Sequence, residues 1–225
     1  MAKNLHIISF SIPYPADYGG VIDVFYKLKS LSQSGVQITL HCFRYDREPA
    51  KELEKFCQKV YYYPRQMKGS HLLGFHPFIV SSRKSEDLIQ NLLKDDAPIL
   101  YEGLHTCYSI NDERLKDRKK IVRSHNIEHD YYTGLAKVER NPMKNLYFKS
   151  EAKKLKRFEE VAYKNASLVL GISQNDTVYL NKYGNAKFIS AFHSFDEIDV
   201  PQQTKPFSLY HGNLSVGENK KQLLF

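Results

Sequence analysis

The stretch Leu5-His-Ile-Ile-Ser-Phe10 leads, after two further residues, into Pro13-Tyr-Pro-Ala-Asp-Tyr-Gly19-Gly20 and then into an amphipathic segment, Val21–Leu31. This order predicts a buried strand that reaches a glycine turn and opens a helix. Such turns bind phosphate in α/β sheets, because free N–H groups and the positive end of the helix dipole attract an anion. Glycine at positions 19 and 20 removes two Cβ atoms from the path of a diphosphate, and we expect Gly20 to adopt a positive φ. The same two residues also fit a plain tight turn without a ligand.

The rest of the chain alternates between strand and helix patterns. Apolar runs predict seven strands, at Leu5–Phe10, Gln37–Phe43, Lys59–Tyr63, Ile99–Glu102, Lys120–Ser124, Leu168–Ile172 and Lys187–Ala191. Helical periodicity occupies Val21–Gln33, Ala50–Lys55, Ser85–Leu93, Glu128–Asn165 with a break at Asn141-Pro142, and Gln174–Lys182. The alternation predicts the α/β class, with a Rossmann-like parallel sheet and helices on both faces.

A change in composition near residue 200 indicates a domain boundary. The segment Asp199–Pro206 is polar and contains two prolines, and residues 207–225 show a new strand, a glycine loop and the start of a helix. We therefore expect one domain over residues 1–200, and a linker with the truncated start of a second domain over residues 201–225.

Composition restricts the class of protein. The chain has 225 residues, 42% of them apolar, which is enough for a packed core. It has no apolar run of about eighteen residues and no signal-peptide pattern, so we expect a cytoplasmic protein. Three widely spaced cysteines, Cys42, Cys57 and Cys107, are expected to be buried thiols. The net charge of +8 favours anionic partners without choosing among them.

Polar side chains follow two neighbouring strands of the predicted sheet. Glu102 and His105 follow the fourth strand, and His125, Asn126 and Glu128 follow the fifth. Because the ligand crevice of an open parallel sheet lies outside the carboxyl ends of its strands, these side chains are expected to share a rim with the glycine turn. A histidine bonded to a nearby carbonyl is the structural alternative for each of them.

Other site motifs are missing from the sequence. The spacing of His125 and His129 suits two metal ligands on one helical face, but no HExxH pattern accompanies them, so no metal site is expected. The glycine turn lacks the GxGxxG pattern, and the sequence contains no GxxxxGK[ST] motif. A nicotinamide-binding domain and a P-loop nucleotidase are therefore excluded.

An ordered set of motifs resembles the N-terminal, acceptor-side domain of a GT-B fold, as in the family 4 retaining glycosyltransferases. The set comprises the glycine turn with its helix, Tyr101-Glu-Gly-Leu-His105, Arg123-Ser-His-Asn-Ile-Glu128, the charged helix Glu151–Glu160, Ser167–Asp176 and Tyr210-His-Gly-Asn-Leu-Ser215. It covers nearly the whole chain.

The resemblance implies two Rossmann-like domains facing each other across a cleft. Gly19 and Gly20 would contact the diphosphate of a nucleotide-sugar donor. A catalytic histidine usually lies at the fourth strand end, where either Glu102 or His105 takes its place, and His125 matches a second catalytic position. Asn126 and Glu128 would bind substrate on the same rim. No cofactor or metal is expected, and a chain without its donor domain is expected to be inactive.

Two other classes of protein stay open. The first is a sugar-nucleotide epimerase or a non-catalytic sugar-phosphate binder of the same architecture. The second is a basic nucleic-acid-binding module, although the sixteen tyrosines are scattered and no RNP-like strand is present. Nucleic acid is therefore not an expected partner.

The acceptor is expected to be a glycan or a lipid-linked glycan. The apolar segment Gln66–Val80, with Leu72, Leu73 and Phe78, has the turn residues of a loop and could form an insertion loop beside the Lys- and Arg-rich helix Pro142–Arg157. Such a pair suits peripheral contact with the inner face of a membrane, whereas a solvated helix face is the simpler alternative.

Overall fold

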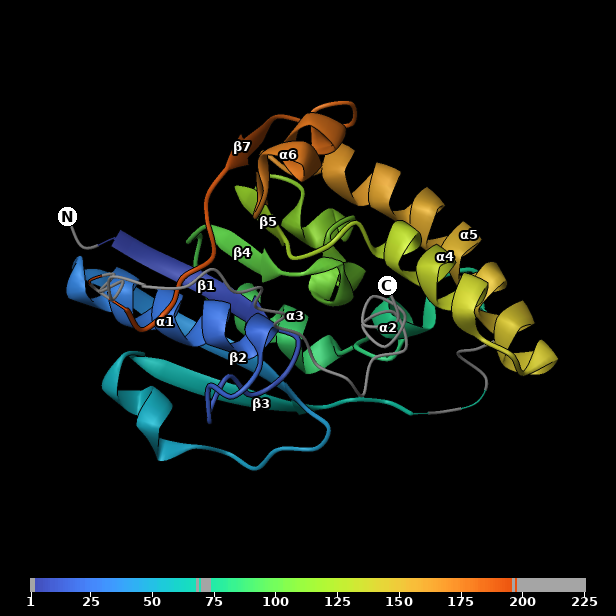
Figure 1. Cartoon of the computed structure of the whole chain (residues 1–225). Helices are drawn as coiled ribbons and strands as arrows, with labels where there is room; N and C mark the ends of the chain where they lie inside the picture. The colour runs from blue at the N-terminus through green and yellow to red at the C-terminus, as the bar shows by residue number, and fades with distance from the viewer. Residues whose placement is uncertain (1–2, 68, 70–73, 196, 198–225) are drawn as a thin grey trace, which may run out of the picture.

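The computed structural model describes residues 3–67, 69, 74–195 and 197. Its centre is a seven-stranded sheet in the order β3-β2-β1-β4-β5-β6-β7, with every neighbouring pair parallel (Figure 1). The strands are β1 (Lys3–Ser9), β2 (Val36–Arg44), β3 (Lys59–Pro64), β4 (Ile99–Glu102), β5 (Lys120–Ser124), β6 (Leu168–Gly171) and β7 (Ala186–Phe188). A strand lies at each of the seven predicted places and the predicted α/β Rossmann-like class is confirmed, but β7 ends at Phe188 and not at the predicted Ala191.

Helices connect the strands at the predicted places. They are α1 (Gly19–Gln33), α2 (Phe78–Ser81), α3 (Glu86–Leu92), α4 (Glu128–Val138), α5 (Pro142–Lys164) and α6 (Gln174–Leu180), with 3-10 turns η1 (Lys51–Lys55), η3 (Leu104–Ser109) and η4 (Glu113–Leu115). The predicted break at Asn141 is confirmed, because its side chain accepts hydrogen bonds from the N–H groups of Met143 and Lys144. The predicted helix at Ala50–Lys55 is a single 3-10 turn, and α2 lies in a segment expected to be a loop.

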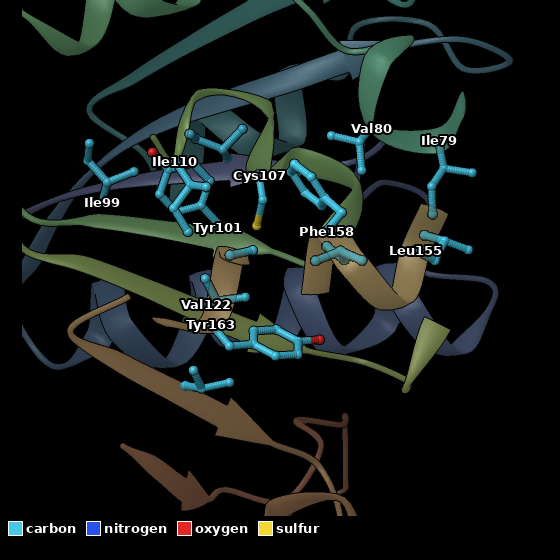
Figure 2. Packing of buried hydrophobic residues seen from close by; sticks show 14 of the residues in the cluster. Ile79, Val80, Ile99, Tyr101, Cys107, Ile110, Val122, Leu155, Phe158 and Tyr163 are labelled. Atoms are coloured by element: carbon cyan, nitrogen blue, oxygen red, sulfur yellow. The ribbon is translucent and has the colours of Figure 1, made fainter. Parts of the chain in front are cut away.

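Apolar side chains pack on both faces of the sheet. On one face, Val24 and Leu28 of α1 lie in a cluster with Ile7, Ile38 and Leu40. The opposite face carries Leu155, Phe158 and Tyr163 of α5, together with Tyr101 and Val122, as Figure 2 shows. Neighbouring residues of β1, Ile7 and Ile8, thus belong to different clusters, as expected for a strand buried on both sides. The three cysteines are buried and free, as predicted.

The strand order fixes where a ligand crevice lies. β1 has β2 on one side and β4 on the other. The connections that follow β1 and β4 therefore run to opposite sides of the sheet. This is the topological switch point of a doubly wound sheet, where ligands bind outside the carboxyl ends of the strands. Ile8 of β1 pairs in register with Tyr101 of β4, which brings the segments after Ser9 and Glu102 together.

The predicted domain boundary lies outside the described residues, as does the predicted start of a second domain. Among the helices that the structure describes, none combines the length and the apolar composition required to cross a bilayer.

Candidate functional site

The glycine turn forms the amino end of α1, at the switch point. Tyr18 precedes the helix in an extended conformation, with φ of −143° and ψ of 160°, and its side chain does not cap the helix. The first turn contains no acidic residue. The N–H groups of this turn therefore have no competing side-chain acceptor, and the positive end of the helix dipole is not neutralised.

The two glycines have different surroundings. A Cβ built on Gly19 would meet nothing within 4 Å, whereas one built on Gly20 would lie 2.8 Å from Cζ of Phe10. The positive φ expected at Gly20 is wrong, since among the described residues only Gly35 and Gly103 have one. Gly20 begins a regular helix and lacks a side chain because Phe10 occupies that space. Gly19 is the residue that leaves open space at the helix terminus.

Phe10 brings the predicted histidines together. Its ring centre lies 5.5 Å from that of His105 and 5.7 Å from that of His125. Gly103, with φ of +76°, turns the chain directly after β4, and a Cβ there would lie 3.1 Å from Nδ1 of His105 and 3.4 Å from Cδ2 of His125. The glycine turn and both histidines therefore meet around one aromatic ring. The sequence analysis did not identify Phe10 as a site residue. The one feature that could have indicated it is an aromatic side chain at the end of the predicted strand Leu5–Phe10.

A buried network of charges lies beneath this rim. Nζ of Lys27 donates to Oδ2 of Asp23 at 2.8 Å and to both carboxylate oxygens of Glu102 at 2.8 and 2.9 Å. Arg123 donates from Nε and Nη2 to the two oxygens of Asp23, at 3.2 and 3.1 Å. Two carboxylates thus balance two cations, which is how buried charge is tolerated. Although burial raises the pKa of Asp23, the charges of Lys27 and Arg123 lower it to about 2.

The same network holds the segment that follows β7. Arg123 donates from Nη1 to the carbonyl of Ile189 at 2.6 Å and from Nη2 to that of Ser190 at 3.0 Å. The N–H of Phe192 donates to Oδ1 of Asp23 at 2.8 Å. The residues directly after β7, up to Phe192, are therefore fixed to α1 and β5, next to the switch point.

Glu102 belongs to the network and not to the solvent-facing rim. Its side chain is 0% exposed, and Oε2 lies 3.1 Å from Nε2 of His125. Burial raises the pKa of Glu102, but the charge of Lys27 and the bond to His125 lower it below its ordinary value. In this geometry Glu102 orients the His125 ring, whose side chain is 11% exposed. Of the two alternatives for the fourth strand end, His105 is the more exposed, at 25% for its side chain.

One group of side chains in the described part of the chain has ligand atoms close enough for a metal ion: Asp23, Glu102 and His125. Lys27 is bonded to both carboxylates, so a divalent cation would have to displace a buried ammonium group. His125 and His129 do not lie on one helical face. His125 precedes α4, whereas Nδ1 of His129 lies 2.6 Å from Oε2 of Glu159 on α5.

Glu128 and His105 form a second buried polar pair. Oε1 of Glu128 lies 3.9 Å from Nδ1 of His105, and neither atom has a hydrogen-bond partner. Burial, followed by the charge of Glu159, raises the pKa of Glu128 to about 8. Burial, followed by the charge of Arg83, lowers the pKa of His105 well below its ordinary value. At neutral pH the pair is thus a carboxylic acid beside an uncharged imidazole. Asn126, the remaining predicted substrate residue, is exposed on the same rim.

We expect Glu128→Gln to stabilise the protein at alkaline pH and to leave its stability nearly unchanged at pH 5. A carboxyl group with a raised pKa contributes stability below its unfolded value of about 4.3, and that contribution is lost as the pH rises through about 8. The gain at pH 9 should be about 1–3 kcal/mol, measured by urea unfolding. Glu113→Gln, on the exposed turn η4, is the control. An equal effect at pH 5 and pH 9 would show that Glu128 is ionised throughout.

No protein-family model matches the chain. Among curated proteins, an uncharacterized 44.6 kDa protein in the cps region of Klebsiella pneumoniae is 30% identical over 155 residues, which cover 66% of this chain and 39% of that protein. The chain thus matches about two fifths of the length of this relative.

Three solved structures resemble the chain. Sucrose-phosphate synthase from Thermosynechococcus elongatus has a TM-score of 0.45 and 14% identity, over 84% of this chain and 89% of that one. TcCGT1 in complex with UDP has a TM-score of 0.49 and 11% identity, over 90% of this chain and 54% of that one. UGT2 of Phytolacca americana, complexed with UDP-2fluoro-glucose and pterostilbene, has a TM-score of 0.46 and 11% identity, over 85% of this chain and 54% of that one. Because these three TM-scores all lie below 0.5, the fold assignment rests on the sheet order and the helix layers described above.

Proposed function

We propose that the chain is the N-terminal domain of a GT-B glycosyltransferase, which transfers a sugar from a nucleotide donor to a glycan or lipid-linked acceptor with retention. The observation that carries the proposal is the convergence of the open helix terminus at Gly19 with His105 and His125 around Phe10, at the switch point of the sheet. The ordered motifs that resemble family 4 enzymes support it. The similarity to a protein from a cps region supports a role in making a cell-envelope polysaccharide.

In this proposal each part of the site has one task. The amides at the start of α1 hold the donor diphosphate and stabilise the negative charge that develops as it leaves, without a metal or other cofactor. His105 and His125 contact the transferred sugar or the acceptor hydroxyl. Glu102 positions His125 from beneath. Asn126 contacts substrate at the rim, and Glu128 lies beneath the rim beside His105.

Product analysis of the complete protein that the gene encodes tests the proposal. Incubation with UDP- and GDP-sugars and candidate acceptors should yield a glycoside, whereas an epimerase would yield an altered sugar nucleotide and a binding protein would yield neither. Salt-sensitive binding to random oligonucleotides would favour the nucleic-acid alternative. Residues 1–225 alone should transfer no sugar.

We expect His125→Ala to lower kcat/KM of the complete protein more than about tenfold, or about 1.4 kcal/mol in transition-state binding. The reason is that His125 is the partly exposed end of the buried network, where its ring can touch a substrate. His129→Ala is a matched control, because that ring pairs with Glu159 instead. If His125→Ala lost thermal stability but kept full activity, its role would be structural, and the assignment would pass to His105.

The acceptor proposed here lies at the inner face of a membrane. Met143 and Leu146 of α5 are 81% and 70% exposed, and Phe75 is 97% exposed. Phe75 lines a hollow of about 540 Å³ together with Lys153 and Arg157 of α5. Apolar side chains beside basic ones suit an anionic bilayer surface, where each cation adds about 1 kcal/mol. Leu72 and Leu73, part of the predicted insertion loop, lie outside the described residues.

We expect the chain to co-sediment with vesicles containing anionic lipid and not with neutral ones. Changing the four basic residues Lys153, Lys154, Lys156 and Arg157 to glutamine should abolish the difference, because the attraction is electrostatic. Changing Lys3, Lys29, Lys51 and Lys55, far from α5 in sequence, to glutamine removes the same charge and is the control. Equal and negligible sedimentation with both lipids would favour a soluble acceptor.

A further inference from the structure

Two arginines on the candidate rim form no ion pair with an acidic residue of the described chain. Arg83, which follows α2, is 5% exposed, and it donates from Nε to the carbonyl of Phe10 at 3.1 Å and from Nη1 to that of Ile79 at 2.5 Å. Arg65, which follows β3, donates from Nε to Oγ of Ser82 at 3.1 Å. All these acceptors are neutral. Because a buried cation is ordinarily matched by an anion, the balancing charge is expected from a ligand.

Both guanidinium groups act on the same region. The charges of Arg83 and Arg65 both contribute to lowering the pKa of His105, after the larger effect of burial. The guanidinium carbon of Arg65 lies 4.8 Å from the ring centre of Tyr45 and 5.7 Å from that of Phe78, which restrains the plane of the group. A restrained guanidinium presents parallel N–H donors that match the oxygens of a carboxylate or a phosphate.

The acidic groups whose charges act on the two arginines form no ion pair with them: Asp46, which acts on Arg65, is exposed, and Glu128, which acts on Arg83, is buried. Glu128 is 3% exposed and has its raised pKa, so at neutral pH it is largely protonated. Its Oε1 and Nδ1 of His105 are buried and without hydrogen-bond partners. The region therefore combines two unbalanced cations with two unsatisfied polar atoms, one of them on a side chain that is almost fully buried.

We propose that Arg65, Arg83 and His105 form a subsite for an oxyanion carried by the acceptor, either the carboxylate of an acidic sugar or the phosphate of a lipid-linked glycan. The assignment to the acceptor rests on the proposed function. It follows from the position of Phe10, whose carbonyl oxygen faces Arg83 while the far end of its ring faces Gly20. Phe10 thus lies between this subsite and the turn assigned to the donor diphosphate.

Calorimetry on the 225-residue chain tests the subsite without requiring sugar transfer. The probes are methyl glucuronide and geranyl diphosphate, with methyl glucoside and geraniol as their uncharged counterparts. At least one anionic probe should bind, its neutral counterpart should not, and Arg65→Gln should weaken binding about tenfold or more. Arg83→Lys, which keeps the positive charge but loses the parallel N–H donors of the guanidinium group, should weaken binding of the anionic probe as well. Arg114→Gln, on an exposed arginine paired with Glu86 and Asp112, should leave it unchanged.

Each outcome decides between sources or contradicts the subsite. Preference for the glucuronide assigns an acidic sugar, and preference for the diphosphate assigns a lipid-linked acceptor. Three results would overturn the subsite. They are equal binding of charged and neutral probes, no binding of either oxyanion at millimolar concentration, and no effect of Arg65→Gln on binding. Loss of UDP binding in Arg65→Gln, to the same extent as loss of the oxyanion, would move these arginines to the donor side. If the protein bound an oxyanion through these arginines but transferred no sugar, the proposed function would be contradicted and the subsite would stand.

Discussion

Arg123→Met should lower the free energy of unfolding by about 3–5 kcal/mol, the largest effect on stability that we expect from a single substitution. Methionine is of similar length, so the loss comes mainly from charge and hydrogen bonds and less from an empty cavity. The substitution removes both donors to the Asp23 carboxylate from β5 and leaves the carbonyls of Ile189 and Ser190 without their partner. Urea unfolding at pH 7 measures the change.

Arg114→Met is the matched control, because it removes the same charge from an exposed ion pair with Glu86 and Asp112. Exposed pairs are screened by water, so the unfolding midpoint should stay nearly the same. Acid provides a second readout. Because the pKa of Asp23 is lowered, its ionised carboxylate stabilises the fold at pH values above about 3.8, and this stabilisation is lost as the pH falls through about 2. The difference in free energy of unfolding between wild type and Arg123→Met should therefore narrow at low pH. Equal midpoints for Arg123→Met and wild type at pH 7 would show that the network contributes little.

If the proposed function holds, Gly19→Val should reduce turnover of the complete protein about a hundredfold, or about 2.7 kcal/mol, with no loss of stability. A Cβ at position 19 meets nothing within 4 Å, so the new side chain fits the fold and occupies only the space in front of the helix terminus. If the donor diphosphate approaches these amides, a branched side chain blocks it. Turnover and thermal unfolding of the same preparation measure the two effects.

Gly20→Val is the comparison, and its expected result is different. Its Cβ would lie 2.8 Å from Cζ of Phe10, so the ring must move against His105 and His125. Both stability and turnover should therefore fall, and the loss of rate in this variant does not isolate a blocked diphosphate. An unchanged rate in Gly19→Val would leave the turn as a structural feature only.

The sequence predicted the sheet well, because each strand is a short apolar run bounded by polar or turn residues. The bounds of β4 and β5 agree with the predicted ones. The helix α2 was missed because its four residues are too few to show a period. The rim was predicted from topology alone, because parallel strands bring their carboxyl ends to one edge.

The depth of each rim residue could not be predicted in the same way. Glu102 and His125 follow neighbouring strands with similar patterns, yet Glu102 is fully buried against Lys27. That partner is 75 residues away in the sequence, and only the packing of α1 on the sheet brings it there. Arg83 shows the same limit, because no local pattern around it indicates that its hydrogen-bond acceptors are backbone carbonyls.

The buried charge network also sets an order of events during synthesis of the chain. Asp23 and Lys27, four residues apart on α1, can pair as soon as that helix forms. Arg123 is made 100 residues after Asp23, and the N–H of Phe192 follows Asp23 by 169 residues. A nascent chain that has not reached Phe192 therefore carries an incomplete set of hydrogen bonds at the centre of its sheet. Because such distant contacts form slowly, the domain should become protease-resistant only after β7 and the segment behind it have left the ribosome.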